Sequence, residues 1–235
     1  MNKICLIHHP IGIGDIFFLQ FVARKYISMG YNIIWPLRND VLWIKDYIPD
    51  ICFCSEDDDF FGKEYYGKDL IFISPNFVYL GLKCAHGWGT GYTHIMKSKY
   101  QLLNLDWNDW NSGFLFNRNF EKENELYYNV LGLNNNSKYV LWNNMASVDI
   151  RTTNILDDLS FDYPTIKLKY IDGFSLFDWC KVFENATEIH TVHTGINYLL
   201  DRLDLKAKKY FMYQGLHIPE VQYIPFVKKP KFIPN

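Results

Sequence analysis

Two short polar stretches of this chain have the residue types that bind phosphate or transfer a proton. Gly14-Asp15 follows the apolar run that ends at Ile7, and His193-Thr194-Gly195 follows the run that ends at Val192. A strand that stops at Thr-Gly and continues as a helix presents backbone N–H groups and the positive end of a helix dipole to one point. That arrangement suits a phosphate or diphosphate. An ordinary strand-to-helix turn has the same pattern, so both interpretations stay open.

The side chains in these stretches have separate expected roles. Gly195 would let a ligand approach the backbone closely, and Thr194 can donate its hydroxyl or cap the next helix. Asp15 can act as a general base at a strand end. It can equally cap a helix that begins at Ile16, and the two roles do not exclude each other.

Alternating strand and helix patterns must position these residues. Strands are predicted at 4–7, 31–35, 51–54, 70–74, 139–142, 166–170, 188–192 and 209–213, and helices at 16–27, 41–47, 120–131, 176–183 and 196–203. This order predicts parallel, doubly wound sheets in an α/β protein.

Three irregular segments divide this pattern. Residues 79–100 are predicted to be a long loop, and the tail after Gln222 is expected to be extended and packed across the other domain. The stretch 133–138, Leu-Asn-Asn-Asn-Ser-Lys, has the composition of a linker. We therefore predict two domains, 1–134 and 135–235.

Composition excludes several classes of function. The chain has 235 residues, 49% of them hydrophobic, and a net charge of -2, so it has no strong field for nucleic acid or anionic membrane. None of its five cysteines forms a C-x-x-C pair, which argues against a zinc site or a disulfide framework. No apolar run has the length of a signal peptide or a transmembrane helix. We expect a cytoplasmic protein that does not bind nucleic acid and has no transmembrane segment.

Several of these stretches together resemble the heptosyltransferase-like glycosyltransferases, two-domain enzymes of the GT-B fold that use nucleotide-activated sugars. The resemblance rests on Gly14-Asp15 before an apolar helix, on Ser175-Leu176, and on the block from Ala186 to Leu199. The chain departs from the family at His193, where Asp is usual, and at Tyr198, where His is common.

The resemblance extends to the start of the second domain. Asn143-Asn144-Met145-Ala146-Ser147 stands where the family has a strand and a Gly-Ala-Ser-like turn. The chain is shorter than the usual family member. The resemblance therefore implies a compact pair of Rossmann-like domains with parallel sheets, the second binding the nucleotide-sugar and the first facing the acceptor.

The same resemblance implies roles for individual residues. Asp15 would be the general base, Arg151 would neutralise the donor diphosphate, and Asp172 would accept from a ribose hydroxyl. Surface positions are the alternative for Arg151 and Asp172. The expected donor-binding set is Gly14, Arg151, Asp172, His193, Thr194, Gly195 and Asn197, and the expected acceptor-side set is His8, His9, His86 and Trp88.

The reaction implied is transfer of a sugar from a nucleoside-diphosphate sugar to a carbohydrate or other hydroxyl acceptor, with inversion and without a metal or cofactor. Asp57 and Asp59 form an Asp-x-Asp pattern, which some metal-dependent sugar transferases use, but no further ligand is paired with them in the sequence. His190 and His193 are predicted to point to opposite faces of a strand and not to share a metal. A sugar-nucleotide epimerase or hydrolase, or a non-catalytic binding remnant, would fit the same fold.

Overall fold

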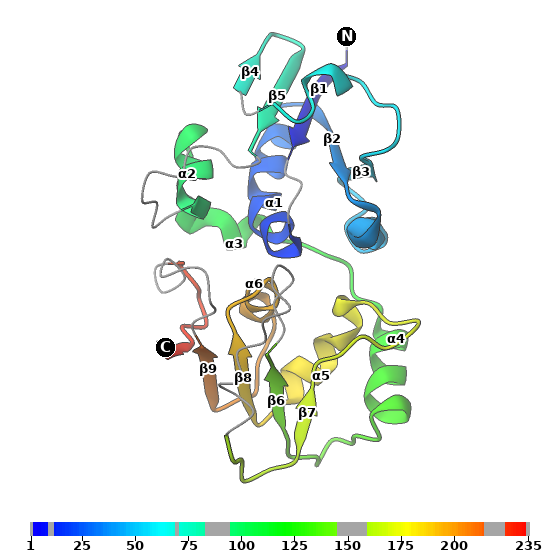
Figure 1. Cartoon of the computed structure of the whole chain (residues 1–235), viewed down its shortest axis with the longest axis vertical. Helices are drawn as coiled ribbons and strands as arrows, with labels where there is room; N and C mark the ends of the chain where they lie inside the picture. The colour runs from blue at the N-terminus through cyan, green and yellow to red at the C-terminus, as the bar shows by residue number, and fades with distance from the viewer. Residues whose placement is uncertain are drawn as a thin grey trace. The chain divides into compact units, whose positions relative to one another are not determined.

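The chain consists of two compact units, Met1–Asn117 (unit 1) and Arg118–Asn235 (unit 2). The computed structural model describes residues 2–8, 12–68, 71–82, 95–144, 159–213 and 224–233. Figure 1 shows that each unit is built on a sheet flanked by helices, and each sheet has five strands. The predicted α/β class with two sheets of mainly parallel strands is confirmed.

The sheet of unit 1 has the strand order β3-β2-β1-β5-β4. Its strands are β1 (Lys3–His8), β2 (Tyr31–Leu37), β3 (Cys52–Ser55), β4 (Ile71–Ile73) and β5 (Phe77–Gly81). All neighbouring pairs are parallel except β4 and β5, which are antiparallel.

Strand β5 is one place where the sequence prediction was wrong, because its residues were assigned partly to the loop 79–100. All five residues of β5 are buried, and the strand pairs with β1 along its whole length. A short, continuous apolar run has no periodicity of its own, so its pairing with a distant strand decides its structure.

The main helix of unit 1 is α1 (Ile13–Ser28), which ends before Gly30 at φ 84°, a conformation that glycine adopts at no steric cost. The shorter elements are η1 (Asn39–Asp46), η2 (Lys63–Tyr65), α2 (Ile95–Leu102), η3 (Trp107–Asp109) and α3 (Trp110–Gly113). Helix α1 buries Phe17 and Phe18 against aromatic residues, among them Phe114, whose ring centroid is 4.6 Å from that of Phe17. The core of unit 1 on this side of the sheet is therefore largely aromatic.

The sheet of unit 2 has the order β10-β9-β8-β6-β7, with every neighbouring pair parallel. Its strands are β6 (Val140–Asn143), β7 (Thr165–Lys167), β8 (Glu188–Val192), β9 (Lys209–Tyr213) and β10 (Lys231–Ile233). Its described helices are α4 (Phe120–Asn124), η4 (Glu125–Val130), η6 (Leu176–Trp179), α5 (Cys180–Asn185) and α6 (Ile196–Arg202). The tail contributes β10 as an edge strand beside β9, which corrects the expectation that it crosses the other domain.

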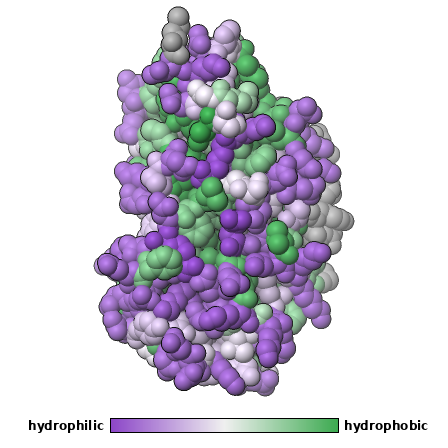
Figure 2. Space-filling view, turned by 180° about the vertical axis from the view of Figure 1, so that it is seen from behind, coloured by the Kyte–Doolittle hydropathy of each residue, from purple (hydrophilic) through white to green (hydrophobic). Residues whose placement is uncertain are grey.

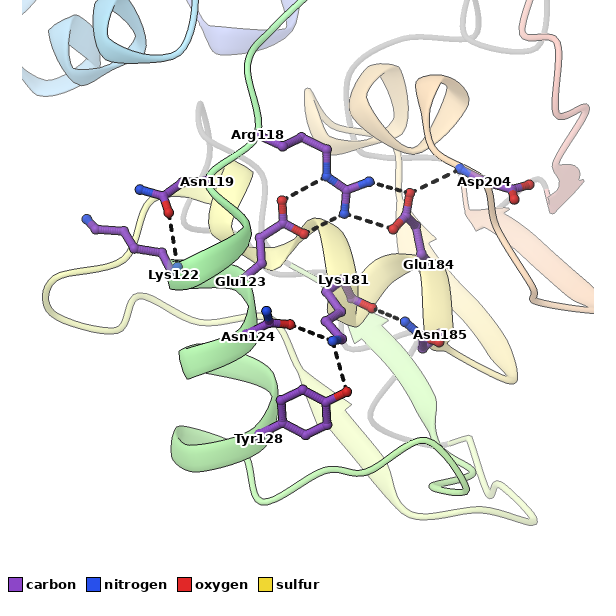
Figure 3. A network of polar contacts seen from close by, with 10 residues as sticks. All are labelled: Arg118, Asn119, Lys122, Glu123, Asn124, Tyr128, Lys181, Glu184, Asn185 and Asp204. Carbon is purple, nitrogen blue, oxygen red and sulfur yellow. Dashed lines mark hydrogen bonds and ion pairs between the residues drawn. The ribbon is translucent and has the colours of Figure 1, made fainter.

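The boundary between the units lies at Asn117–Arg118, earlier than the boundary at 134/135 that the linker-like composition predicts. Polar contacts explain the difference (Figure 3). Arg118 donates to the carboxylates of both Glu123, on α4, and Glu184, on α5, and Lys181 donates to Asn124 over 2.6 Å. Segment 118–130 is thus bound to α5 and belongs to unit 2.

Polar residues cover most of the face seen in Figure 2, with hydrophobic residues in separate patches among them. In the part of the chain that the structure describes, no helix is long and apolar enough to cross a membrane.

Candidate functional site

The order of strands in unit 2 defines where a ligand is expected to bind. Within the sheet, β6 has β7 as its neighbour on one edge and β8, which comes later in the chain, as its neighbour on the other edge. In open α/β sheets, ligands bind at the carboxyl ends of the strands where the strand order reverses in this way. In unit 2 that point lies at the ends of β6 and β8, where Asn143, Asn144, His193 and Thr194 stand.

The two asparagines at the end of β6 are almost completely buried. Asn143 Nδ2 donates to Thr194 Oγ1 over 3.5 Å, which links the ends of β6 and β8. Asn144 is only 3% exposed, and its buried Oδ1 has no hydrogen-bond partner among the described residues. A buried acceptor without a donor costs free energy, and a ligand N–H or O–H at this position would recover that cost. The donor-binding prediction did not include these two side chains, although both residues stood in the motif that carried the resemblance.

The turn His193-Thr194-Gly195 connects β8 to α6. Gly195 has φ −53° and ψ −26°, so the turn does not depend on a left-handed glycine, and no side chain caps α6. Thr194 therefore does not have the capping role that was one of its two predicted roles. The hydroxyl of Thr194 instead accepts the hydrogen bond from Asn143.

The side chain of Asn197 forms hydrogen bonds with the backbone of this turn. Its Nδ2 donates to the carbonyl oxygens of Val192 (3.0 Å) and Thr194 (3.2 Å), and its Oδ1 accepts from Thr191 Oγ1 (2.6 Å) and Tyr210 OH (2.7 Å). The side chain is fully buried, and these four bonds use both its donors and its acceptor capacity. We assign Asn197 to the shape of the turn rather than to contact with a ligand.

Asp172 is an exposed residue of the segment that follows β7. Its Oδ1 accepts a hydrogen bond from Tyr170 OH over 3.3 Å. The surface position that was the alternative for this residue is the one observed.

Asp15 lies in the first turn of α1. The helix begins at Ile13 with Gly12 at the cap position, φ 82°, so Asp15 is not the cap that the sequence suggested for a helix starting at Ile16. A carboxylate in the first turn still interacts favourably with the helix dipole. Gly14, predicted to bind the donor, is a residue of this same helix in unit 1.

Asp15 forms an ion pair with a residue that the sequence did not point to. Lys99 Nζ, on α2, lies 2.7 Å from Asp15 Oδ1. The side chain of Lys99 is 2% exposed and that of Asp15 is 23% exposed. Lys99 was overlooked because residues 79–100 were assigned to a loop, although Ile95–Leu102 is helical. The signal available was a stretch without Gly or Pro in which most residues, among them Met96, Lys97, Lys99, Gln101 and Leu102, favour helix.

His8 ends β1 and is 1% exposed. Its Nδ1 lies 3.3 Å from Tyr79 OH, and its ring centroid is 4.1 Å from that of Tyr66. These contacts place the histidine inside unit 1. The other predicted site residues His9, His86, Trp88 and Arg151 lie outside the described residues.

Two of the remaining metal candidates, Asp57 and His190, are engaged with protein groups. Asp57 Oδ2 accepts from Asn39 Nδ2 over 2.9 Å. His190 Nδ1 lies 3.0 Å from Tyr213 OH, and its Nε2 lies 3.5 Å from Glu188; burial lowers the pKa of this histidine. Among the described residues, no three His, Cys, Asp or Glu side chains are grouped so that they could hold a metal ion.

Comparison with known proteins shows similarity in fold alone. No protein-family model matches the chain, and no curated protein sequence matches it. A solved structure of a family 9 glycosyltransferase from Veillonella parvula matches 100% of this chain and 87% of its own, with a TM-score of 0.56 and 10% sequence identity.

Two structures of the iron-containing, dodecameric glycosyltransferase TibC from enterotoxigenic E. coli also match. The first has a TM-score of 0.54 and 13% identity; the second, a complex with ADP-D-β-D-heptose described as a heptosyltransferase, has a TM-score of 0.56 and 14% identity. Each match covers 99% of this chain but only 62% of the TibC chain. The chain thus shares the fold of these glycosyltransferases and spans 62% of the TibC chain.

Proposed function

We propose that this protein is a glycosyltransferase that moves a sugar from a nucleoside-diphosphate sugar to a hydroxyl acceptor. The observation that carries the proposal is the group Asn143, Asn144 and Thr194 at the point where the strand order of unit 2 reverses. The shared fold with glycosyltransferases supports it, as does the carboxylate of Asp15 at the corresponding end of unit 1. One of the TibC structures holds a nucleotide-sugar, which makes this class of donor the first to consider.

In the proposed donor site, unit 2 supplies neutral hydrogen-bonding groups from two strands. Asn144 Oδ1 accepts a hydrogen bond from the donor, and the turn at Thr194 presents its backbone to the diphosphate. Asn143 fixes Thr194 through the bond between their side chains. Arg151, outside the described residues, is the proposed cation for the diphosphate, as Arg forms strong bidentate hydrogen bonds with phosphate oxygens.

In the proposed reaction, Asp15 takes the proton of the acceptor hydroxyl as its oxygen attacks the anomeric carbon. The bond from that carbon to the diphosphate oxygen breaks, and the nucleoside diphosphate leaves with the bonding electrons. A single displacement of this kind inverts the anomeric configuration. It needs no metal if protein groups stabilise the departing diphosphate.

Donor binding is the first test. We expect ADP, GDP, UDP or CDP, or one of their sugars, with ADP-heptose tried first, to raise the melting temperature of the protein and to give a measurable Kd in calorimetry. Asn144→Ala should weaken this binding at least about tenfold, or 1.4 kcal/mol. The same variant should keep or gain stability without ligand, because the lost amide oxygen makes no hydrogen bond with the described residues.

The control for this test is Asn129→Ala, which removes an exposed amide bonded to Glu125 on η4 and should leave the affinity unchanged. An unchanged affinity in Asn144→Ala would place the donor elsewhere.

Turnover measurements then separate the rival functions. Release of free sugar without an acceptor indicates a hydrolase, and a rearranged nucleotide-sugar indicates an epimerase. Binding without turnover indicates a non-catalytic protein.

A further inference from the structure

The ion pair between Asp15 and Lys99 joins a partly exposed carboxylate to a buried ammonium group. Nζ of Lys99 is 2.7 Å from Oδ1 of Asp15, within the range of a strong, charge-assisted hydrogen bond. Burying an ammonium group is costly, and a carboxylate in direct contact offsets that cost. The position of this lysine is therefore tied to the position of Asp15.

Helix α2 places Lys99 through the next residue, Tyr100. The Tyr100 side chain is fully buried, and its hydroxyl donates to the backbone carbonyl of Phe18 on α1 over 2.5 Å. Its ring also contacts that of Phe18, with centroids 4.9 Å apart. Phe18 lies about one turn after Asp15 on α1. These contacts therefore fix the position of Lys99 along the axis of α1, next to the carboxylate of Asp15.

The second oxygen of Asp15 lies beside the backbone of Gly12. A Cβ atom built on Gly12 would lie 3.5 Å from Oδ2, and the backbone of Gly12, φ 82°, is one that other residues rarely adopt. Lys99 on one oxygen and glycine beside the other give the two carboxylate oxygens different surroundings.

We propose that Lys99 is a positioning residue for the general base: its contact with Oδ1 holds the carboxylate of Asp15 in the orientation in which it meets the acceptor hydroxyl. This inference rests on the proposed function, in which Asp15 takes the proton. Lys99 itself does not touch the substrate. A carboxylate held in one orientation by a buried cation loses less entropy when it meets the hydroxyl, and small misplacements of a catalytic group cost large factors in rate.

Stability measurements test the pair without any substrate. Asp15→Asn keeps the shape of the side chain but leaves the buried ammonium without a countercharge, so the melting temperature should fall by on the order of 10 °C. Adding Lys99→Met to Asp15→Asn removes the charge and should recover most of that loss. Lys99→Met alone should cost less than Asp15→Asn, because the remaining carboxylate is partly exposed to water.

Rate measurements test the positioning role. With the nucleotide-sugar and acceptor that give the highest rate for the wild-type protein, Lys99→Met should lower kcat at least about tenfold while the KM of the donor stays within about twofold. In the Asp15→Asn background the same substitution should cause no further loss, since the group it positions is already absent. Lys97→Met is the matched control: Lys97 lies on the same helix, beside the ring of Trp107, and its loss should leave kcat unchanged.

The possible failures are distinct. If the wild-type protein turns over no nucleotide-sugar, the proposed function fails and the positioning role fails with it. If the wild-type protein is active and Lys99→Met has an unchanged kcat, the proposed function stands and Lys99 is only structural. An additive fall in kcat for the two substitutions would likewise overturn the inference, because Lys99 would then act independently of Asp15.

Discussion

The hydroxyl of Thr191, in β8, donates to Oδ1 of Asn197, in α6, over 2.6 Å. This bond, with the two that Asn197 donates to backbone carbonyls, closes the turn at the end of β8 over a buried amide. The turn is the part of unit 2 that we propose to face the donor diphosphate. The shape of the turn therefore depends on the side chain of Asn197, whose donors and acceptor are already used in hydrogen bonds within the protein.

Asn197→Asp tests this dependence. The carboxylate can still accept from Thr191 and Tyr210 but can no longer donate to the carbonyls of Val192 and Thr194, and it introduces a buried charge. We expect a loss of about 3 kcal/mol or more in the free energy of unfolding, measured by urea denaturation. Asn185→Asp, on the more exposed end of α5, is the control and should change stability by less than about 1 kcal/mol. A stable Asn197→Asp variant would contradict the assigned role.

Gly195→Val tests how closely a nucleotide approaches the turn. Gly195 has helical backbone angles, so valine at this position causes no backbone strain. We therefore expect the Gly195→Val variant to fold. Nucleotide affinity should fall at least about tenfold, or 1.4 kcal/mol, in calorimetry if the diphosphate lies against this backbone. An unchanged Kd in the folded variant would place the diphosphate away from residue 195.

Gly173→Ala is the control for that experiment: it should lower stability but leave nucleotide affinity unchanged. Gly173 has φ 81°, and an added Cβ would meet no atom within 4 Å. The substitution should therefore cost about 1 kcal/mol through backbone strain, while the nucleotide Kd stays unchanged.

Removal of divalent metals tests the proposed mechanism. Transfer activity should survive dialysis against EDTA, because protein groups rather than a cation are proposed to stabilise the leaving diphosphate. Asp57→Asn should also keep its activity, since this carboxylate is bonded to Asn39. Loss of activity in EDTA that Mn²⁺ or Mg²⁺ restores would overturn metal independence and bring Asp57 and Asp59 back as ligands.

The stability of unit 2 should depend on pH through His190. Burial lowers the pKa of this side chain from 6.5, so the unfolded chain takes up a proton at a higher pH than the folded chain does. Stability contributed by the neutral ring is present above pH 6.5 and is lost as the pH falls below it. The pKa of Glu188 is also lowered, chiefly by its hydrogen bond with Lys209, but the stability that this contributes is present above pH 4.5 and is lost only as the pH falls below that value.

His190→Gln is the variant that isolates this effect. Glutamine can keep a hydrogen bond with Tyr213 but does not titrate, so the free energy of unfolding should fall less between pH 7 and pH 5 than in the wild-type protein. Urea denaturation at a series of pH values measures the difference, and the other histidines are the same in both proteins. Equal pH dependence in the two proteins would show that His190 does not contribute.

Local sequence patterns were enough to predict most strands of both units and the general architecture. The strands at Tyr31–Leu37, Glu188–Val192 and Lys209–Tyr213 lie where the sequence predicted them within two residues, because alternation and buried apolar runs are local properties. The same patterns placed Thr194-Gly195 just after a strand, as observed, whereas Asp15, also predicted at a strand end, lies in the first turn of α1. The resemblance that these motifs suggested agrees with the fold of the glycosyltransferase structures that match the chain.

Tertiary structure alone decided the contacts of these residues. Lys99 is distant from Asp15 in the sequence, and the packing of Tyr100 against α1 brings the two charges together. Segment 118–130 joins unit 2 because Arg118 binds Glu184, a contact that no local composition predicts. Likewise, an asparagine after a Thr-Gly turn can bind a ligand or hold the turn, and the four partners of Asn197 determine which. Periodicity specifies which face of an element is buried, but only the folded chain specifies which distant polar groups meet there.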